Sequence, residues 1–188
     1  MKMKNRFLRK RYIGIILLII GSCLKAQVVT VSGDWAATIP AITEAGTNYT
    51  GTYSNASIPT TDITLSTTLT GNFLTLLAGK GAKMTMRYTS NAWNSSLILS
   101  ARRTGPTTGS ISGLCALCTA TITGGDTFIP IVSTADTTFF TLSFGGLLGV
   151  NNTANFSNIN LILQLSGVSV TIPAANYSAR IIFTVVSN

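Results

Sequence analysis

The clearest pattern in the chain is an alternation of apolar and polar residues between Asn158 and Val186. Successive side chains of a strand point to opposite faces, so this period of two predicts strands with one apolar face each. A helix would need apolar residues three and four positions apart, and the segment lacks that spacing. Breaks are expected at Ser166-Gly167 and at Pro173. The three predicted apolar faces consist of Ile159, Leu161, Leu163 and Leu165; of Val168, Val170 and Ile172; and of Tyr177, Ala179, Ile181, Phe183 and Val185.

The rest of the body shows shorter stretches of the same kind, separated by turns rich in Gly, Asn and Pro. Met84 and Met86 alternate with polar neighbours, and residues 138–144 separate into two faces, with Phe139 on one and Phe140 on the other. The segment from Arg102 to Gly113 is rich in Gly, Thr and Ser, which predicts a long irregular loop with the Arg102-Arg103 pair in solvent. About nine or ten short strands are expected, and no helix.

These patterns predict one all-β domain over residues 27–188, an antiparallel β-sandwich of the immunoglobulin-like type. A closed or partly open β-barrel is the alternative. The composition agrees with a packed core, because 46% of residues are hydrophobic and only 10% are charged. A disordered chain would combine low hydrophobicity with high charge.

The first 26 residues have the pattern of a secretory signal peptide. Residues 1–11 are basic, residues 12–22 are almost wholly apolar, and Ala26-Gln27 is a suitable cleavage site. The apolar run is shorter than the roughly 20 residues that span a bilayer, although an uncleaved anchor is an alternative. Ile20-Gly21-Ser22-Cys23 also resembles a lipobox, so lipidation at Cys23 competes with cleavage after Ala26. We therefore expect export, in transit through the periplasm, to the outer cell surface or the medium of a bacterium.

The net charge of +8 belongs mainly to this leader. Seven of the thirteen basic residues lie within residues 1–26, whereas all five acidic residues lie beyond them, so the body carries only about +1. Nucleic-acid binding would require a basic surface on the folded domain, so we expect no nucleic-acid partner. We expect membrane contact only through the leader or through a lipid on Cys23.

Cys115 and Cys118 remain after cleavage at Ala26. In an exported protein the pair is interpreted as a structural disulfide, with free thiols or a redox site as alternatives. A thioredoxin-like site would require a strand followed by a helix, and a zinc site would require further Cys or His ligands. Neither pattern is present in the sequence, so we predict no metal and no cofactor.

Catalysis is not expected, and no catalytic residue is assigned. The chain has no histidine, so a Ser-His-Asp or Cys-His arrangement cannot be built. The five acids are scattered near turns, and Asp126 and Asp136 are interpreted as turn residues in preference to calcium ligands.

Aromatic residues suggest one binding role, in which their rings form a platform for stacking sugars. The alternative is that they fill the core or its rim. The candidates are Trp35, Tyr49, Tyr53, Tyr88 and Trp93.

The tail from Ala175 to Val185 resembles the final strand of spore-coat-U-like and chaperone–usher pilin subunits, which often end in Gly-X-Tyr and an alternating strand. Here Ala175 stands where those subunits have Gly. The resemblance implies an immunoglobulin-like domain that is incomplete alone and accepts a strand from a neighbour. Residues Gln27 to Val31 would be the donor, although they could instead pair as the first strand of their own sheet.

The predicted function is therefore that of an exported, non-catalytic bacterial surface protein of the pilin, fimbrial-subunit or adhesin kind. It would work by strand pairing and surface contacts, with copies of itself or other surface subunits as partners. The alternative is a secreted carbohydrate-binding module with glycans as ligands.

Overall fold

A computed structural model of the chain describes residues 27–40, 50–57, 63–70, 81–115, 117–146 and 152–188. These residues contain strands and one short 3₁₀ turn, η1 (Asn55–Ser57), and no α-helix. The strands are β1 (Val28–Ser32), β2 (Thr50–Ser54), β3 (Ile63–Thr70), β4 (Ala82–Asn91), β5 (Ile98–Thr104), β6 (Thr108–Ser112), β7 (Thr119–Thr123), β8 (Ile129–Pro130), β9 (Thr137–Gly145), β10 (Thr153–Ser169) and β11 (Ser178–Ser187).

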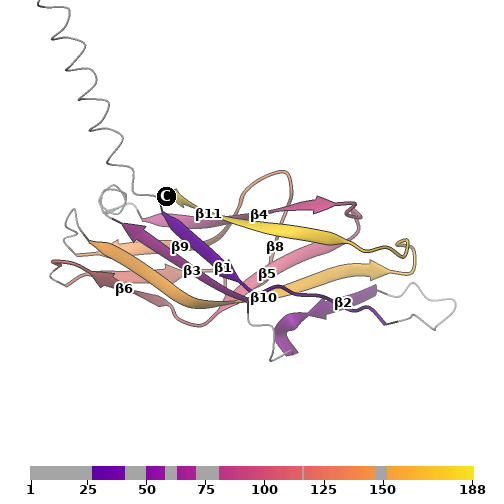
Figure 1. Cartoon of the computed structure of the whole chain (residues 1–188), viewed down its shortest axis with the longest axis horizontal. Helices are drawn as coiled ribbons and strands as arrows, with labels where there is room; N and C mark the ends of the chain where they lie inside the picture. Colours follow the sequence, from indigo (N-terminus) through magenta and orange to yellow (C-terminus); the bar gives the residue numbers. More distant parts are fainter. Residues whose placement is uncertain (1–26, 41–49, 58–62, 71–80, 116, 147–151) are drawn as a thin grey trace, which may run out of the picture.

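The longest strand, β10, has 17 residues and pairs with four other strands. Along one edge it pairs first with β3 and then with β2, and along the other edge first with β6 and then with β5 (Figure 1). The predicted turn at Ser166-Gly167 is wrong, because β10 continues through it as a bulge between Leu165 and Val168. Gly167 has φ +79°, a left-handed conformation that glycine adopts without strain.

A second bulge in β10 lies between Phe156 and Ile159. An extra residue in the strand shifts the alternation by one position, so residues three apart point to the same side. Phe156 and Ile159 accordingly are both buried, as is Val168 three residues after the inward-facing Leu165. Bulges also bend a strand, which lets β10 curve across the molecule.

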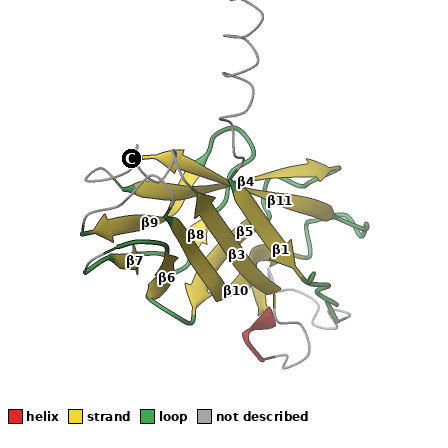
Figure 2. Cartoon of the chain, turned by 60° about the vertical axis from the view of Figure 1, so that its left-hand side comes forward, coloured by secondary structure: helices red, strands yellow, loops and turns green. Residues whose placement is uncertain are grey.

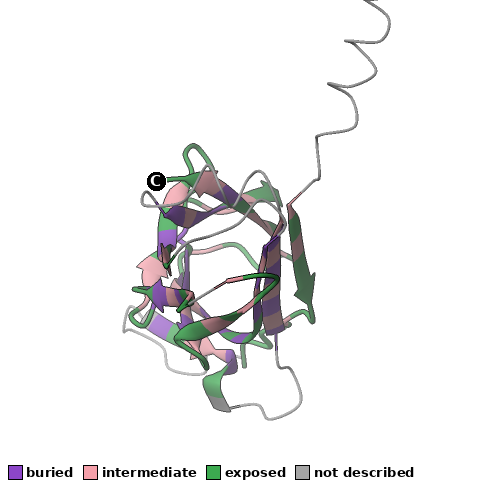
Figure 3. Ribbon diagram, turned by 90° about the vertical axis from the view of Figure 1, so that its left-hand side faces the viewer, coloured by how far each residue is buried: buried purple, intermediate pink, exposed green. Residues whose placement is uncertain are grey.

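All pairings are antiparallel, and the main path of hydrogen-bonded neighbours is β1-β3-β10-β6-β7-β9-β4-β11. This single path of eight strands curls round a common interior until β1 and β11 approach each other (Figures 2 and 3). The all-β antiparallel prediction is confirmed. Of the two predicted architectures, the partly open barrel describes this continuous path better than an immunoglobulin-like pair of separate sheets.

The interior is filled by the inward faces of these strands. Met84 and Met86 are buried, as their alternation predicted. Phe139 and Phe140 are both buried, because the pairing of β4 with β9 shifts register between Met84 and Thr85. Each such phenylalanine contributes about 1.5–3 kcal/mol by leaving water. The predicted face of β11 is mostly half-buried, with only Val185 fully inside, because β11 lies at the end of the path.

The irregular loop predicted from Arg102 to Gly113 is also wrong in part. β5 continues to Thr104, and β6 begins at Thr108, so only a short connection remains. Arg103 is buried, with 6% of its surface exposed, and its guanidinium donates to the carbonyls of Gly124 and Pro106. Arg102 points the other way and lies over the ring of Phe128. Alternation along β5 therefore separates the two arginines.

The buried side chain of Asn55 completes the ladder of β10 where one partner strand replaces another. β3 pairs as far as Leu161, and β2 begins at Gln164. In the interval, the Asn55 side-chain amide donates to the Leu161 carbonyl at 3.2 Å and accepts from the Leu163 N–H at 2.7 Å. One side chain thus supplies the donor and the acceptor that a strand would offer.

Replacing Asn55 by Ala should therefore destabilise the barrel. Two buried backbone groups of β10 would lose their partners, at about 1–3 kcal/mol each, so a loss of about 3 kcal/mol in unfolding free energy is expected in urea titrations. Asn160→Ala, at an exposed position of β10, is the control and should change stability by less than about 0.5 kcal/mol. Equal effects of the two variants would show that Asn55 does not hold the ladder together.

Candidate functional site

A large open cavity, lined by described residues, lies at the end of the barrel where β4 and β10 finish and β5 and β11 begin. Its volume is about 930 Å³. Leu99 and Leu163 line it from the interior, and Ile181 lines it from β11. Trp35 and Ile39 come from the segment that follows β1. Gly33, at φ +92°, turns the chain after β1 and directs this segment to the cavity rim.

The cavity lining is uncharged and only partly apolar. None of the described lining residues carries a charge, but Thr38, Ser169, Asn176 and Ser178 lie beside the aliphatic and aromatic residues. The indole N–H of Trp93 donates to the Leu97 carbonyl at 3.0 Å, and the hydroxyl of Tyr177 donates to the Pro173 carbonyl at 2.8 Å. Because these polar atoms already bond within the protein, the rings offer mainly apolar surface. A neutral group is the occupant that such a cavity favours.

The predicted aromatic platform is not brought together on one exposed face. Trp35, Tyr88 and Trp93 are half-buried and pack against the core, and Tyr88 contacts Trp93 with ring centres 5.4 Å apart. Tyr53 is half-buried in β2, and Tyr49 lies outside the described residues. The alternative, in which these rings fill the core and its rim, therefore describes Trp35, Tyr88 and Trp93. Trp35 and Trp93 also share the wall of the uncharged cavity.

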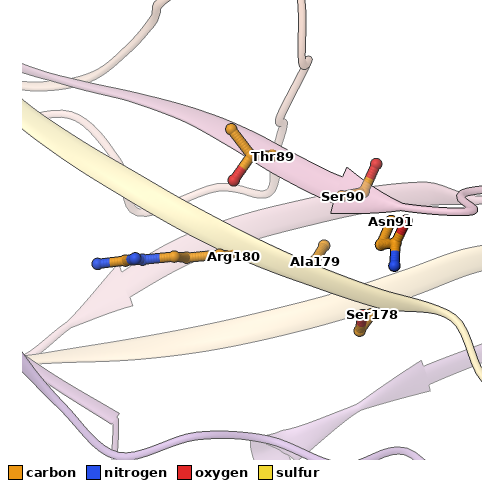
Figure 4. A pocket seen from close by; sticks show the side chains of 6 residues that line it. All are labelled: Thr89, Ser90, Asn91, Ser178, Ala179 and Arg180. Carbon is orange, nitrogen blue, oxygen red and sulfur yellow. The ribbon is translucent and has the colours of Figure 1, made fainter.

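A smaller hollow of about 350 Å³ lies on the paired ends of β4 and β11 (Figure 4). Thr89, Ser90 and Asn91 line it from β4, opposite residues 178–180 of β11. Arg180 extends away from Ser90 and Asn91, so these polar groups do not converge on one point (Figure 4). We assign no chemistry to this hollow.

The acidic residues that the structure describes lie apart from one another. Asp34, Asp126 and Asp136 are exposed, and Asp136 pairs with Arg87 at 3.5 Å on the surface. Glu44 and Asp62 lie outside the described residues. Within the part of the chain that is described, no group of three or more His, Cys, Asp or Glu side chains could hold a metal ion.

Cys115 and Cys118 are joined as a disulfide in the tight connection between β6 and β7. Next to them, Leu114 and Leu117 are 97% and 93% exposed, the highest values among the exposed large hydrophobic residues of the described chain. Leu117 adopts φ +59°, which is unusual for a residue with a large side chain. Sequence reasoning identified the two cysteines but gave no signal for the exposed leucines.

The predicted leader, including Cys23, lies outside the described residues. Across the described ranges, no helix combines the length and hydropathy that crossing a bilayer requires.

Compared with protein-family models, curated proteins and solved structures, the chain gives no match. The resemblance of its tail to spore-coat-U-like and pilin subunits therefore stays a prediction.

The uncharged cavity should bind a neutral fluorophore such as N-phenyl-1-naphthylamine at its aliphatic and aromatic residues, with a rise in the emission of the dye. Two rim alanines, Ala37 and Ala175, offer a way to block entry. The double substitution Ala37→Trp with Ala175→Trp should weaken binding at least tenfold, because two indole rings would occupy the mouth. Ala135→Trp, at an exposed position away from the cavity, is the control. Undiminished binding by the double variant would place the dye elsewhere.

Proposed function

We propose that the chain is an exported, non-catalytic bacterial surface protein of the pilin or adhesin kind, and that its copies associate through exposed strand edges. The signal-peptide pattern of residues 1–26 supports export. The near-neutral body supports a role in packing and assembly in preference to nucleic-acid binding.

The observation that carries this proposal is the seam between β1 and β11. These strands are the two ends of the hydrogen-bonded path, and within the described chain no strand pairing joins them. Each therefore presents one edge of backbone N–H and C=O groups that a further strand could pair with. β11 is ten residues long, lacks proline and carries one charge, Arg180, so its edge has few features that would prevent pairing.

β1 is the element best suited to exchange between copies. In this chain β1 pairs with β3 in five consecutive positions. The segment thus forms the first strand of its own sheet, as in the alternative to strand donation. Only Val29 of this strand packs against the core, whereas Val28 and Val31 are 53% and 43% exposed. A strand held mainly by backbone hydrogen bonds loses little when the same pairing forms with another copy.

The second candidate function is carbohydrate binding, favoured by the presence of Trp35 and Trp93 in one cavity wall. Sugars require several hydrogen-bonding groups, and Thr38, Asn176 and Ser178 provide such groups in the lining of this cavity. Quenching of tryptophan fluorescence by a glycan would support this alternative.

Strand exchange can be detected with cysteines at Thr30 and Ser66, which are opposite each other in the β1–β3 register. A Thr30→Cys chain mixed with a Ser66→Cys chain should form a covalent dimer on oxidation, because β1 of one copy would lie on β3 of the other. The dimer is measured on a non-reducing gel.

The matched control replaces Ser66→Cys with Thr64→Cys, which faces Ser32 in the register. This mixture should yield little dimer, because Thr30 and Thr64 are not partners. A single chain that carries both Thr30→Cys and Ser66→Cys reports intramolecular pairing by forming an internal disulfide. If this chain forms the internal disulfide while neither mixture gives a dimer, β1 pairs only within its own copy and the strand-exchange proposal fails.

A further inference from the structure

The cavity at the end of the barrel has an aliphatic inner wall and a polar rim. Its buried lining residues are all leucine or valine, and each is at most 8% exposed: Leu97, Leu99, Leu163 and Val168. Thr38, Asn176 and Ser178 are exposed instead, and none of these three side chains hydrogen-bonds to another described residue. The side-chain groups that could hydrogen-bond to a ligand therefore lie at the opening, and the surface behind them is aliphatic.

The rim also leaves aliphatic surface in solvent. Ile39 and Val170 line the cavity and are 40% and 49% exposed. Ile39 belongs to the segment after β1, and Val170 follows the last residue of β10. An alkyl chain that extends beyond the inner wall would remove this surface from water, which is favourable, whereas a wholly polar ligand would not.

Two kinds of ligand fit this distribution poorly. A free sugar carries hydroxyls around its ring, and any that met the buried leucines would lose water without gaining a hydrogen-bond partner. A fatty acid or another anion would bring a charge to a lining in which no described residue is a cation.

We propose that the cavity binds a neutral amphiphile with one alkyl chain and a hydroxylated head. The chain lies against the inner leucines, and the hydroxyls of the head hydrogen-bond to Thr38, Asn176 and Ser178 at the rim. The cavity volume of about 930 Å³ lies within the range of about 300–1,000 Å³ that is common for ligand pockets. This binding goes beyond the proposed function, because it requires neither association of copies nor exchange of β1.

The tryptophans of the chain provide a readout for this cavity. The sequence contains two, Trp35 and Trp93, and both line the cavity wall. A change in the intrinsic tryptophan emission of the exported protein therefore reports a ligand that enters the cavity.

The probes are methyl, hexyl, heptyl and octyl glucoside, titrated as monomers. All four have the same head, so a dependence of affinity on the alkyl group measures contact with the inner wall. From hexyl to octyl glucoside, each added methylene should strengthen binding about fourfold, and methyl glucoside should bind at least about a hundredfold more weakly than octyl glucoside. Octyl sulfate, which combines the same chain with a charged head, should bind at least about tenfold more weakly than octyl glucoside.

Two variants separate the contribution of the chain from that of the head. Ala179→Phe, at a half-buried lining position of β11, fills part of the cavity and should reduce the dependence of affinity on chain length. Asn176→Ala with Ser178→Ala removes two rim groups and should weaken binding of hexyl, heptyl and octyl glucoside equally, by about tenfold. Both rim positions are exposed, so this double variant tests the proposal even if Ala179→Phe does not fold. Ala135→Phe, exposed and outside the cavity lining, is the control and should bind as the wild type does.

Four results would overturn the proposal: emission that does not respond to octyl glucoside, equal affinities across the glucoside series, tighter binding of octyl sulfate than of octyl glucoside, or binding that both variants leave unchanged. Equal affinities that include methyl glucoside would identify a sugar site and support the second candidate function instead. Strand exchange is measured separately by the Thr30→Cys and Ser66→Cys mixture. Failure of the glucoside titrations therefore leaves the proposed function in place, and failure of the cysteine mixture leaves this site in place.

Discussion

The barrel depends on one strand, β10, which pairs with two other strands along each of its edges. β10 pairs with β3 and β2 on one side and with β6 and β5 on the other, so it holds the two ends of the molecule together. A strand of 17 residues can do this only if it bends and if its ladder has no gap. The bulges near Asn158 and Gly167 provide the bend, and Asn55 fills the gap.

The barrel stays open along one side. Among the described residues no strand pairing joins β1 to β11, so the path ends in two free edges. β11 runs for ten residues, whereas β1 has five before Gly33 turns the chain. Trp35 and Ile39, which follow that turn, line the cavity.

Much of the fold follows from the sequence because strand alternation is a local property. The inward faces of Leu161, Leu163 and Met84 were predicted from spacing alone. Bulges shift that spacing by one residue without a distinct signal, so Gly167 was interpreted as a turn, and Phe139 was placed on the face opposite Phe140 although both are buried. Arg103 is buried because nearby carbonyls accept its hydrogen bonds, which composition cannot reveal.

The candidate sites were less accessible to sequence reasoning. The cavity is built from the segment after β1, the ends of β4 and β10 and the start of β11, and their proximity depends on register across the whole sheet. The exposure of Leu114 and Leu117 runs against the usual preference of leucine for the interior, so hydropathy alone would place both in the core. In the sequence, only Cys115 and Cys118 drew attention to the connection between β6 and β7.

Residue-resolved hydrogen exchange of the backbone amides tests most directly the claim that β10 is paired along both edges while the path ends at an open seam. The account predicts slow exchange at successive residues of β10 where both partners are present, as at residues 153–155, 160–161 and 164–165. It predicts slow exchange at only every second residue of β11, because the intervening amides face the seam. Uniformly slow exchange along β11 of the monomer would show a closed barrel and contradict the account.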